Sequence, residues 1–299
     1  MVDLGYSKIT NDVIIGQSPR RVDLNIETAT DMYPGRLAAK GTTDFDLVVC
    51  NALLPPGGWL GYGLANSAAK PTNRATAYAA DKVAPLHKGA GFPVRTQLAA
   101  GAKVDRYNLV ANWASGQVIG PVSQGDGGIW LTVPFVKKTS EFDTTIELPA
   151  NMIVKDTLVE VITNVASGTI DVGLLSSEAG GDADGFVDGQ DCATAGIYRP
   201  GATLTTGSNE VYYSAAVRGA LLRALTAGSD VATDVGTYEE NIHLCDGTAK
   251  SLSYTTSDHT ITGNIHLLLV HPNFQVIAQA DETIDASAAA AALWAMSRI

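Results

Sequence analysis

The sequence predicts an all-β protein with an N-terminal arm, a small β-barrel, a jelly-roll-like antiparallel β-sandwich and a short C-terminal helix. Two observations predict the β class. From Lys82 to Gln117, short apolar pieces alternate at close intervals with Gly, Pro and Asn, a spacing that suits brief strands. In the second half, Thr169–Leu174 (TIDVGL) alternates apolar and polar residues with the period of a half-buried strand.

Residues 1–30 are predicted to form the arm. They hold two short apolar pieces, Val13, Ile14 and Ile15 and then Val22–Leu24, on either side of a Pro-Arg-Arg turn. Such a segment can add a strand to a neighbouring sheet, so Val13, Ile14 and Ile15 are candidate interaction residues. The alternative is a frayed leader that orders weakly.

Residues 31–136 are predicted to form the barrel. The segment opens with Tyr33-Pro34-Gly35, continues through a strand candidate at Phe45–Cys50, and turns at Pro55–Gly58. It is expected to close with a strand over Ile129–Phe135. The frequent turn residues favour short strands over helices or βαβ units.

Residues 140–280 are predicted to form the sandwich. Four stretches have the pattern of strands: Leu158–Thr163, Thr169–Leu174, Val211–Val217 and Thr260–Val270. Long loops rich in Gly, Asp and Ser separate them, without a strong amphipathic helix, which favours an antiparallel jelly roll. Ala215–Leu225 is ambiguous, because a short helix there would contain Gly219.

Residues 285–299 are predicted to form a helical tail. The segment is rich in Ala, begins with an acidic residue and carries Arg298 in its last turn, as the helix dipole favours. In a helix, Leu293 and Met296 share a face and Trp294 makes a second apolar contact. The sequence therefore predicts Leu293, Trp294 and Met296 as docking residues for another subunit or for the same domain.

Composition limits the partners. The net charge is -11 and the pI is about 4.8, which disfavours nucleic acid and anionic membrane surfaces as partners. Only 17% of the residues are charged, which suits a subunit covered by copies or other proteins. No secretory signal pattern and no apolar run of about 18 residues are found. Cys50, Cys192 and Cys245 are too few and too scattered for a disulfide framework or a zinc cluster. Cys50 and Cys245 are expected to be small buried hydrophobes in a chain assembled in a reducing cytoplasm.

One acidic loop is a weak candidate for a metal site. Asp182, Asp184, Asp188 and Asp191 supply hard oxygens beside Gly turns, as calcium requires. The spacing is not that of an EF-hand, and Asp and Gly also serve ordinary turn geometry. We therefore predict neither a bound metal nor a cofactor.

Signals for catalysis are lacking in the sequence. The five histidines have no metal-ligand spacing, and neither a nucleophile elbow nor a Walker loop is found. Glu239-Glu240, or Asp143 with Glu147, would offer a carboxylate pair, but without aromatic subsites. The sequence predicts that the protein is not an enzyme.

Two regions carry a resemblance to a known group of proteins. Tyr33–Gly35 and Lys82–Ile119 resemble the capsid decoration (cement) proteins of tailed bacteriophages, which have a small β-barrel or β-tulip domain. Asn108 is preceded by Tyr107 where many members have Lys-Gly, so that turn departs from the pattern. Leu148–Gly196 also resembles phage structural-protein sequence.

The resemblance implies a virion structural protein: a homotrimer that binds the major capsid protein outside the icosahedral shell, after assembly in the host cytoplasm. It implies no catalytic residues. One alternative is a head fibre or receptor-binding protein that recognises host glycans, with candidate platforms at Tyr198, Tyr212, Tyr213 and Tyr238. Another is a jelly-roll shell-forming capsid protein, which usually needs a basic arm and here has only Arg20-Arg21.

Overall fold

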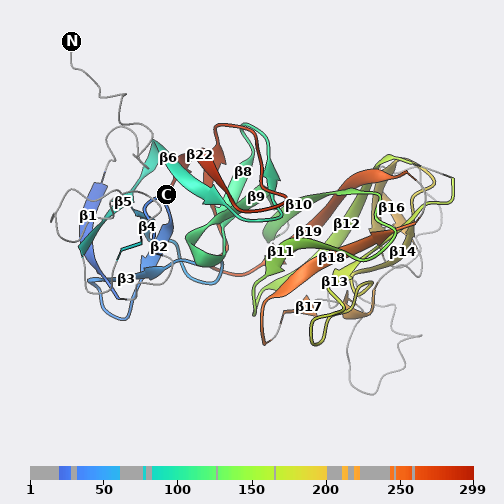
Figure 1. The fold of residues 1–299 in the computed structure, drawn as a ribbon, viewed down its shortest axis with the longest axis horizontal. Helices are drawn as coiled ribbons and strands as arrows, with labels where there is room; N and C mark the ends of the chain where they lie inside the picture. The colour runs from blue at the N-terminus through green and yellow to red at the C-terminus, as the bar shows by residue number, and fades with distance from the viewer. Residues whose placement is uncertain are drawn as a thin grey trace, which may run out of the picture. The chain divides into compact units, whose positions relative to one another are not determined.

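The computed structural model describes residues 20–27, 32–60, 77–78, 83–125, 127–164, 166–200, 211–214, 219–222, 243–245, 247–257 and 260–299 (Figure 1). This part of the chain is all-β, which confirms the predicted fold class. Its helical segments are two short 3-10 turns, Ala114–Gly116 and Ala220–Leu222. Two compact units are present: a barrel unit, Met1–Ser123 with Pro272–Ile299, and a jelly-roll unit, Gln124–His271.

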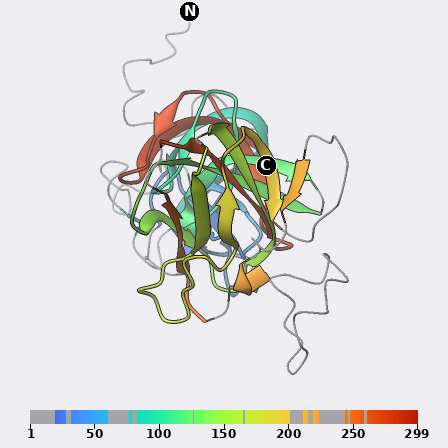
Figure 2. The ribbon, with the colours of Figure 1, turned by 90° about the vertical axis from the view of Figure 1, so that its right-hand side faces the viewer.

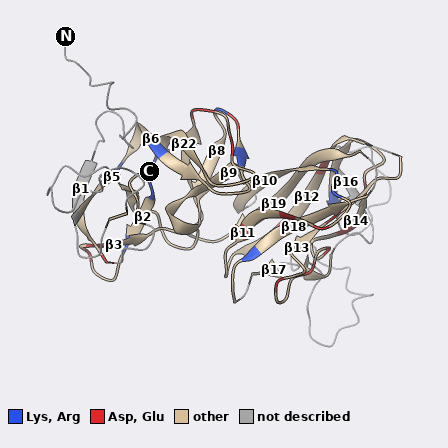
Figure 3. Cartoon of the chain, viewed as in Figure 1, with Lys and Arg blue, Asp and Glu red and all other residues tan. Residues whose placement is uncertain are grey.

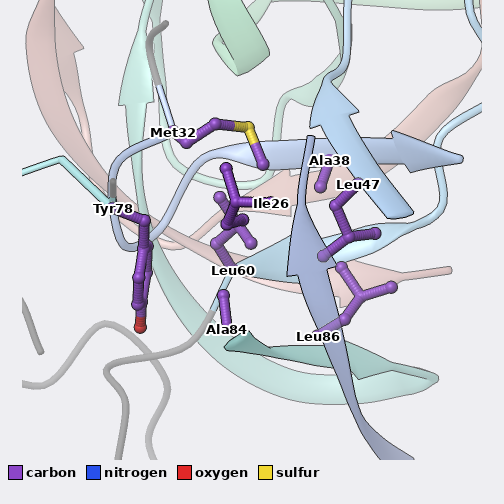
Figure 4. Packing of buried hydrophobic residues seen from close by; sticks show 8 residues of the cluster. All are labelled: Ile26, Met32, Ala38, Leu47, Leu60, Tyr78, Ala84 and Leu86. Atoms are coloured by element: carbon purple, nitrogen blue, oxygen red, sulfur yellow. The ribbon is translucent and has the colours of Figure 1, made fainter. Parts of the chain in front are cut away.

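The first barrel of the barrel unit closes in the order β1-β3-β2-β4-β5. Its strands are β1 (Arg20–Ile26), β2 (Leu37–Lys40), β3 (Asp46–Val49), β4 (Gly58–Leu60) and β5 (Val83–Lys88). The interior is filled by the cluster of Figure 4: Ile26, Met32, Ala38, Leu47, Leu60, Tyr78, Ala84 and Leu86. Removing these side chains from water is the main source of the barrel's stability.

The described part of the expected arm belongs to this barrel. β1 pairs antiparallel with β5, which places Val22 opposite Leu86 and Leu24 opposite Ala84. Leu24 is partly buried and packs against the core cluster of its own chain. The other predicted arm contacts, Val13, Ile14 and Ile15, lie outside the described residues.

A second barrel follows in the same unit. Its strands are β6 (Ala90–Leu98), β8 (Leu109–Asn112), β9 (Val118–Gly125), β20 (Val276–Ala280) and β22 (Ala291–Arg298). β9 pairs with β6, β6 with β22, β22 with β20, β20 with β8, and β8 again with β9, so the pairings form a closed ring. A short antiparallel ribbon is formed by β7 (Lys103–Val104), between β6 and β8 in the sequence, and β21 (Ile284–Asp285), between β20 and β22.

The prediction of a C-terminal helix over 285–299 is wrong, because this segment holds β21 and β22. In β22, the buried residues Leu293, Ala295 and Ser297 alternate with partly exposed neighbours, the period of a strand. The strand fills the gap between β6 and β20 and pairs with both. A helix would leave both ladders without partners, so tertiary context overrides the helix propensity of Ala.

The jelly-roll unit contains two antiparallel sheets, which can be followed by colour in Figures 1 and 2. One has the order β10-β19-β12-β15 and the other the order β11-β18-β13-β14. The strands are β10 (Gly128–Val136), β11 (Phe142–Leu148), β12 (Ile153–Thr163), β13 (Thr169–Leu174), β14 (Val187–Asp191), β15 (Gly196–Pro200), β18 (Lys250–Thr256) and β19 (Thr262–Val270). When these eight strands are numbered from 1 to 8 in chain order, the first sheet has the order 1-8-3-6 and the second has the order 2-7-4-5. This arrangement is that of a jelly roll.

Two further strands extend the first sheet of this unit. β16 (Val211–Ser214) pairs parallel with β15, and β17 (His243–Leu244) pairs with β12. Alternation in β10 buries Ile129, Leu131, Val133 and Phe135 on one face, and β19 does the same with Ile265, Leu267 and Leu269. The regular period identifies this face as the core side.

The units divide the chain differently from the expected boundaries at 31–136 and 140–280. The expected closing strand of the barrel is β10, the first strand of the jelly roll, and residues 272–280 belong to the second barrel. Both differences have one physical cause. The period of two identifies a strand and its buried face, but it does not say which distant strand is its partner.

Candidate interaction surface

The three docking residues predicted near the C-terminus divide between the two faces of β22. Leu293 is fully buried, whereas Trp294 and Met296 are partly exposed. Successive side chains of a strand point to opposite faces, so Trp294 and Met296 lie on the outer face of the second barrel. Leu293 is therefore a core residue, and Trp294 and Met296 remain available for contacts.

Trp294 is held in place on this outer face. It lies opposite Arg95 of β6, and the guanidinium carbon of Arg95 is 5.2 Å from the centroid of its ring. Its backbone N–H donates to Glu282 Oε1 at 2.7 Å, and its carbonyl accepts from the N–H of Asp281 at 2.8 Å. Met296 lies opposite Pro93 on the same strand pair. The result is a fixed aromatic and aliphatic surface across β6 and β22.

A second pair of arginine and aromatic residues lies in the turn between β7 and β8. The guanidinium carbon of Arg106 is 5.0 Å from the ring centroid of Tyr107, and Tyr107 is 62% exposed. Arg106 also donates to Asp281 Oδ1 at 3.2 Å. Asp281 thus contacts both pairs, through its backbone on one side and its carboxylate on the other. We call this set the arginine–aromatic surface: Arg95, Arg106, Tyr107, Asp281, Trp294 and Met296.

Ion pairs balance the charge beside this surface. Arg106 pairs with Asp281, and Lys103 pairs with Asp285 at 3.5 Å. The pKa of Asp285 is lowered by the hydrogen bonds from Ser287 and further by Lys103. Figure 3 shows charged residues along the chain as short blue and red stretches between long uncharged ones. Such exposed pairs contribute little to stability, but they lower the electrostatic cost of bringing another protein to this surface.

Arg95, Arg106 and Tyr107 were not predicted from the sequence as members of the surface. Tyr107 was noted from the sequence only as a departure from the Lys-Gly turn expected of decoration proteins. Nothing local marked Arg95, because its contact with Trp294 depends on pairing between strands at opposite ends of the chain.

Three aspartates of the candidate calcium loop, Asp182, Asp184 and Asp188, interact electrostatically, whereas Asp191 lies at the end of β14. The carbonyl of Asp182 accepts from the N–H of Leu174, while Asp191 Oδ1 caps the N–H of Ala193 at the other end of β14. A hydrogen bond shared between the carboxyl groups of Asp182 and Asp184, together with burial, raises the pKa of Asp182. Across the described residues, no three His, Cys, Asp or Glu side chains come together to hold a metal ion. The Asp182 carbonyl and the Asp191 carboxylate each accept a local backbone hydrogen bond.

The carboxylate pairs considered for catalysis are used locally where the structure describes them. Asp143 Oδ1 accepts from the N–H of Thr145, and Glu147 Oε1 accepts from the Ser251 hydroxyl. Glu239 and Glu240 lie outside the described residues.

One polar network crosses a sheet of the jelly-roll unit. His266 Nδ1 is 3.0 Å from Thr132 Oγ1, and its Nε2 is 3.4 Å from Glu160 Oε2. Asn264 Nδ2 donates to the same carboxylate oxygen at 2.6 Å. Burial lowers the pKa of His266, although Glu160 opposes the shift, which favours a neutral ring at neutral pH. The network offers hydroxyl, imidazole, amide and carboxylate groups side by side on β10, β19 and β12.

Among the four candidate glycan platforms, the structure describes the side chain of Tyr198. Tyr198 donates its hydroxyl to the carbonyl of Thr194 at 2.7 Å. Tyr212 and Tyr213 lie in β16, where the sequence expects a strand, and Tyr238 is outside the described residues.

No family model, curated protein or solved structure matches this chain. In the ranges that the structure describes, no helix has the length and apolar character needed to cross a membrane.

Proposed function

We propose that the protein is a virion structural protein, a decoration (cement) subunit that stabilises the icosahedral head of a tailed bacteriophage from outside. The observation that carries the proposal is the jelly-roll strand order of Gln124–His271. Jelly rolls recur in viral capsid and lectin domains and in cupins. The resemblance in the barrel region and the paucity of charge favour the first of these uses.

The two closed barrels of the same chain support a structural role. Closing a sheet removes the free edges that would otherwise pair with other chains. A subunit packed at high density on a shell would then avoid unspecific strand pairing with its neighbours, because its contacts are restricted to particular side-chain surfaces. In this proposal the subunit is a homotrimer, and the arginine–aromatic surface contacts either another copy or the major capsid protein.

Virion copy number tests the proposal. Quantitative mass spectrometry of purified virions of the encoding phage should find hundreds of copies, in a ratio to the major capsid protein that fits three-fold sites. Adding purified protein to undecorated heads should show saturable binding and raise the temperature at which they release DNA. A vertex or tail component would instead be present at about a dozen copies, as the symmetry of the head requires.

Glycan binding is a second candidate, favoured by the network of Thr132, Asn264, Glu160 and His266 described above. Its groups both donate and accept hydrogen bonds, as sugar hydroxyls require, and Trp130 of β10 is partly exposed. A glycan array with wild-type protein and Asn264→Ala tests it. Binding that the substitution abolishes would favour a receptor-binding protein over a decoration subunit.

The shell-forming alternative has less support. It requires a basic arm, and Arg20 and Arg21 lie in β1, paired in register with Lys88 and His87 of β5.

A further inference from the structure

The turn between β7 and β8 holds a bulky side chain in a backbone conformation that suits glycine. Tyr107 has a φ of 75°, in the left-handed region. For a residue with a large side chain this is a genuine outlier, and such outliers cluster at functional sites. The strained backbone at Tyr107 therefore indicates that its side chain has a function that glycine could not supply.

The backbone of the turn is held from several sides, so the strain is not relieved. The N–H of Tyr107 donates to the carbonyl of Ala280 at 2.8 Å, and its own carbonyl accepts from Gln279 Nε2 at 3.0 Å. Asn108 closes the turn by donating to the carbonyl of Asp105 and accepting from the N–H of Asp105 through its side chain. Tyr107 is consequently presented in one fixed backbone conformation.

Packing within the subunit does not explain the choice of tyrosine. The side chain is 62% exposed, and the guanidinium of Arg106 lies against its ring. Gly at this position would remove the strain and retain every backbone hydrogen bond of the turn. A contact outside the subunit explains why a large aromatic residue is held here.

We infer that Tyr107 and Arg106, with Trp294 and Arg95 beside them, form the contact between copies of this chain. Tyr, Trp and Arg are the residues that most often dominate binding energy at protein interfaces. A ring fixed before binding also loses little conformational entropy when the partner arrives.

The local charge identifies a second copy as the occupant. The chain carries -11 net charge, so its copies repel each other, and they meet at the lowest electrostatic cost where charge is nearly balanced. Around this turn the charges do nearly balance, with three cations and four acids: Arg95, Lys103, Arg106, Asp105, Asp281, Glu282 and Asp285. A basic partner would be drawn to the more acidic remainder of the chain. This contact rests on the homo-oligomer of the proposed function, but it does not depend on the proposed role in the capsid.

Sedimentation velocity across a concentration series tests the contact with the full chain. Tyr107→Gly should raise the dissociation constant of the oligomer at least about tenfold, as expected for an interface hot spot. Because it relieves strain, it should leave the melting temperature of the dissociated subunit unchanged or higher. Tyr107→Asn, which tolerates the left-handed region, gives a second variant should the glycine variant fold poorly.

Phe45→Ser is the matched control. Phe45 is 70% exposed in the first barrel and has an ordinary φ, so its loss should leave association unchanged. An oligomer that Tyr107→Gly does not weaken would overturn the contact and leave the proposed homotrimer standing. A wild-type chain that stays monomeric would overturn both, while the copy number in virions would still test the capsid role by itself.

Discussion

The first barrel takes its five strands from residues 20–88, whereas the second combines strands from residues 90–125 with two strands from residues 276–298. The first can close from nearby parts of the chain, which keeps the entropy cost of loop closure low. The second remains open until the C-terminal segment returns to fill the gap between β6 and β8. The comparison suggests that the first barrel is locally determined and that the integrity of the second, with its exposed surface, depends on the chain's end.

Deleting residues 291–299 should have the largest effect. β6 and β20 would both lose their neighbour, and Gly89 would lose the bond from its N–H to the Ile299 carbonyl. Hydrogen exchange should show loss of protection in β6, β8 and β20. The amides of β10, β12 and β19 in the jelly-roll unit serve as the internal control. Retained protection in β6 would show that the second barrel closes without its last strand.

Leu293→Ala and Trp294→Ala separate the inner face of β22 from its outer face. Leu293 is fully buried, so its truncation should lower the free energy of unfolding by about 2–5 kcal/mol. Trp294 is partly exposed and stacked by Arg95, so its truncation should cost only about 1–2 kcal/mol of unfolding free energy. Urea unfolding measures both. Equal losses would mean that Trp294 also serves the core and is not primarily a contact residue.

Ser297→Ala tests how the two barrels are joined. The buried Nε1–H of Trp59, in β4, donates to Ser297 Oγ of β22 at 3.0 Å. Removing the hydroxyl leaves that donor unpaired and should lower the unfolding free energy by about 1–3 kcal/mol. Ser123→Ala, at an exposed position of β9, is the control and should change little. If the two substitutions have the same effect, the hydrogen bond does not couple the barrels.

How much of this could be predicted from the sequence differs between the two barrels. Turn residues and alternating apolar positions predicted strands across residues 82–119, and the local pattern of β13 predicted its buried face correctly. The pattern of β22 is equally regular: Leu293, Ala295 and Ser297 are its buried positions. Its Ala content nevertheless predicted a helix, because propensity acts locally while the ladders to β6 and β20 are fixed by distant segments.

The residues of the candidate surface also divide into those predicted from local sequence and those placed by pairing between distant segments. Trp294 and Met296 were predicted as contact residues from the apolar character of the tail, although in the wrong secondary structure. Arg95 could not be assigned to them, because cross-strand pairing with β6 alone places it beside Trp294. The left-handed backbone of Tyr107 depends on hydrogen bonds to Gln279 and Ala280. Those bonds join segments far apart in the sequence.

The smallest expected effect is the pH dependence of stability that one carboxylate contributes near each barrel. Asp285, beside the second, has a pKa lowered by its hydrogen bonds from Ser287 and by Lys103; Asp44, in the first, has a pKa lowered by Lys40. Because each folded-state pKa lies below the ordinary 3.8, each carboxylate stabilises the fold above that pH, and this stabilisation is lost as the pH falls through the folded-state pKa. Both groups are exposed, so solvent screening keeps each contribution small.

Asp285→Asn and Asp44→Asn should each lower the urea midpoint slightly at pH 7. Neither should lower it once the pH is below the lowered folded-state pKa, where the wild-type carboxyls are protonated. Measuring the midpoint of both variants at several pH values checks this. A larger loss for Asp285→Asn would sharpen the comparison, because it would show that the β7–β21 ribbon helps to hold the returning C-terminal segment. A loss at pH 7 that persists unchanged in acid would mean that the charge of Asp285 has no part in that stabilisation.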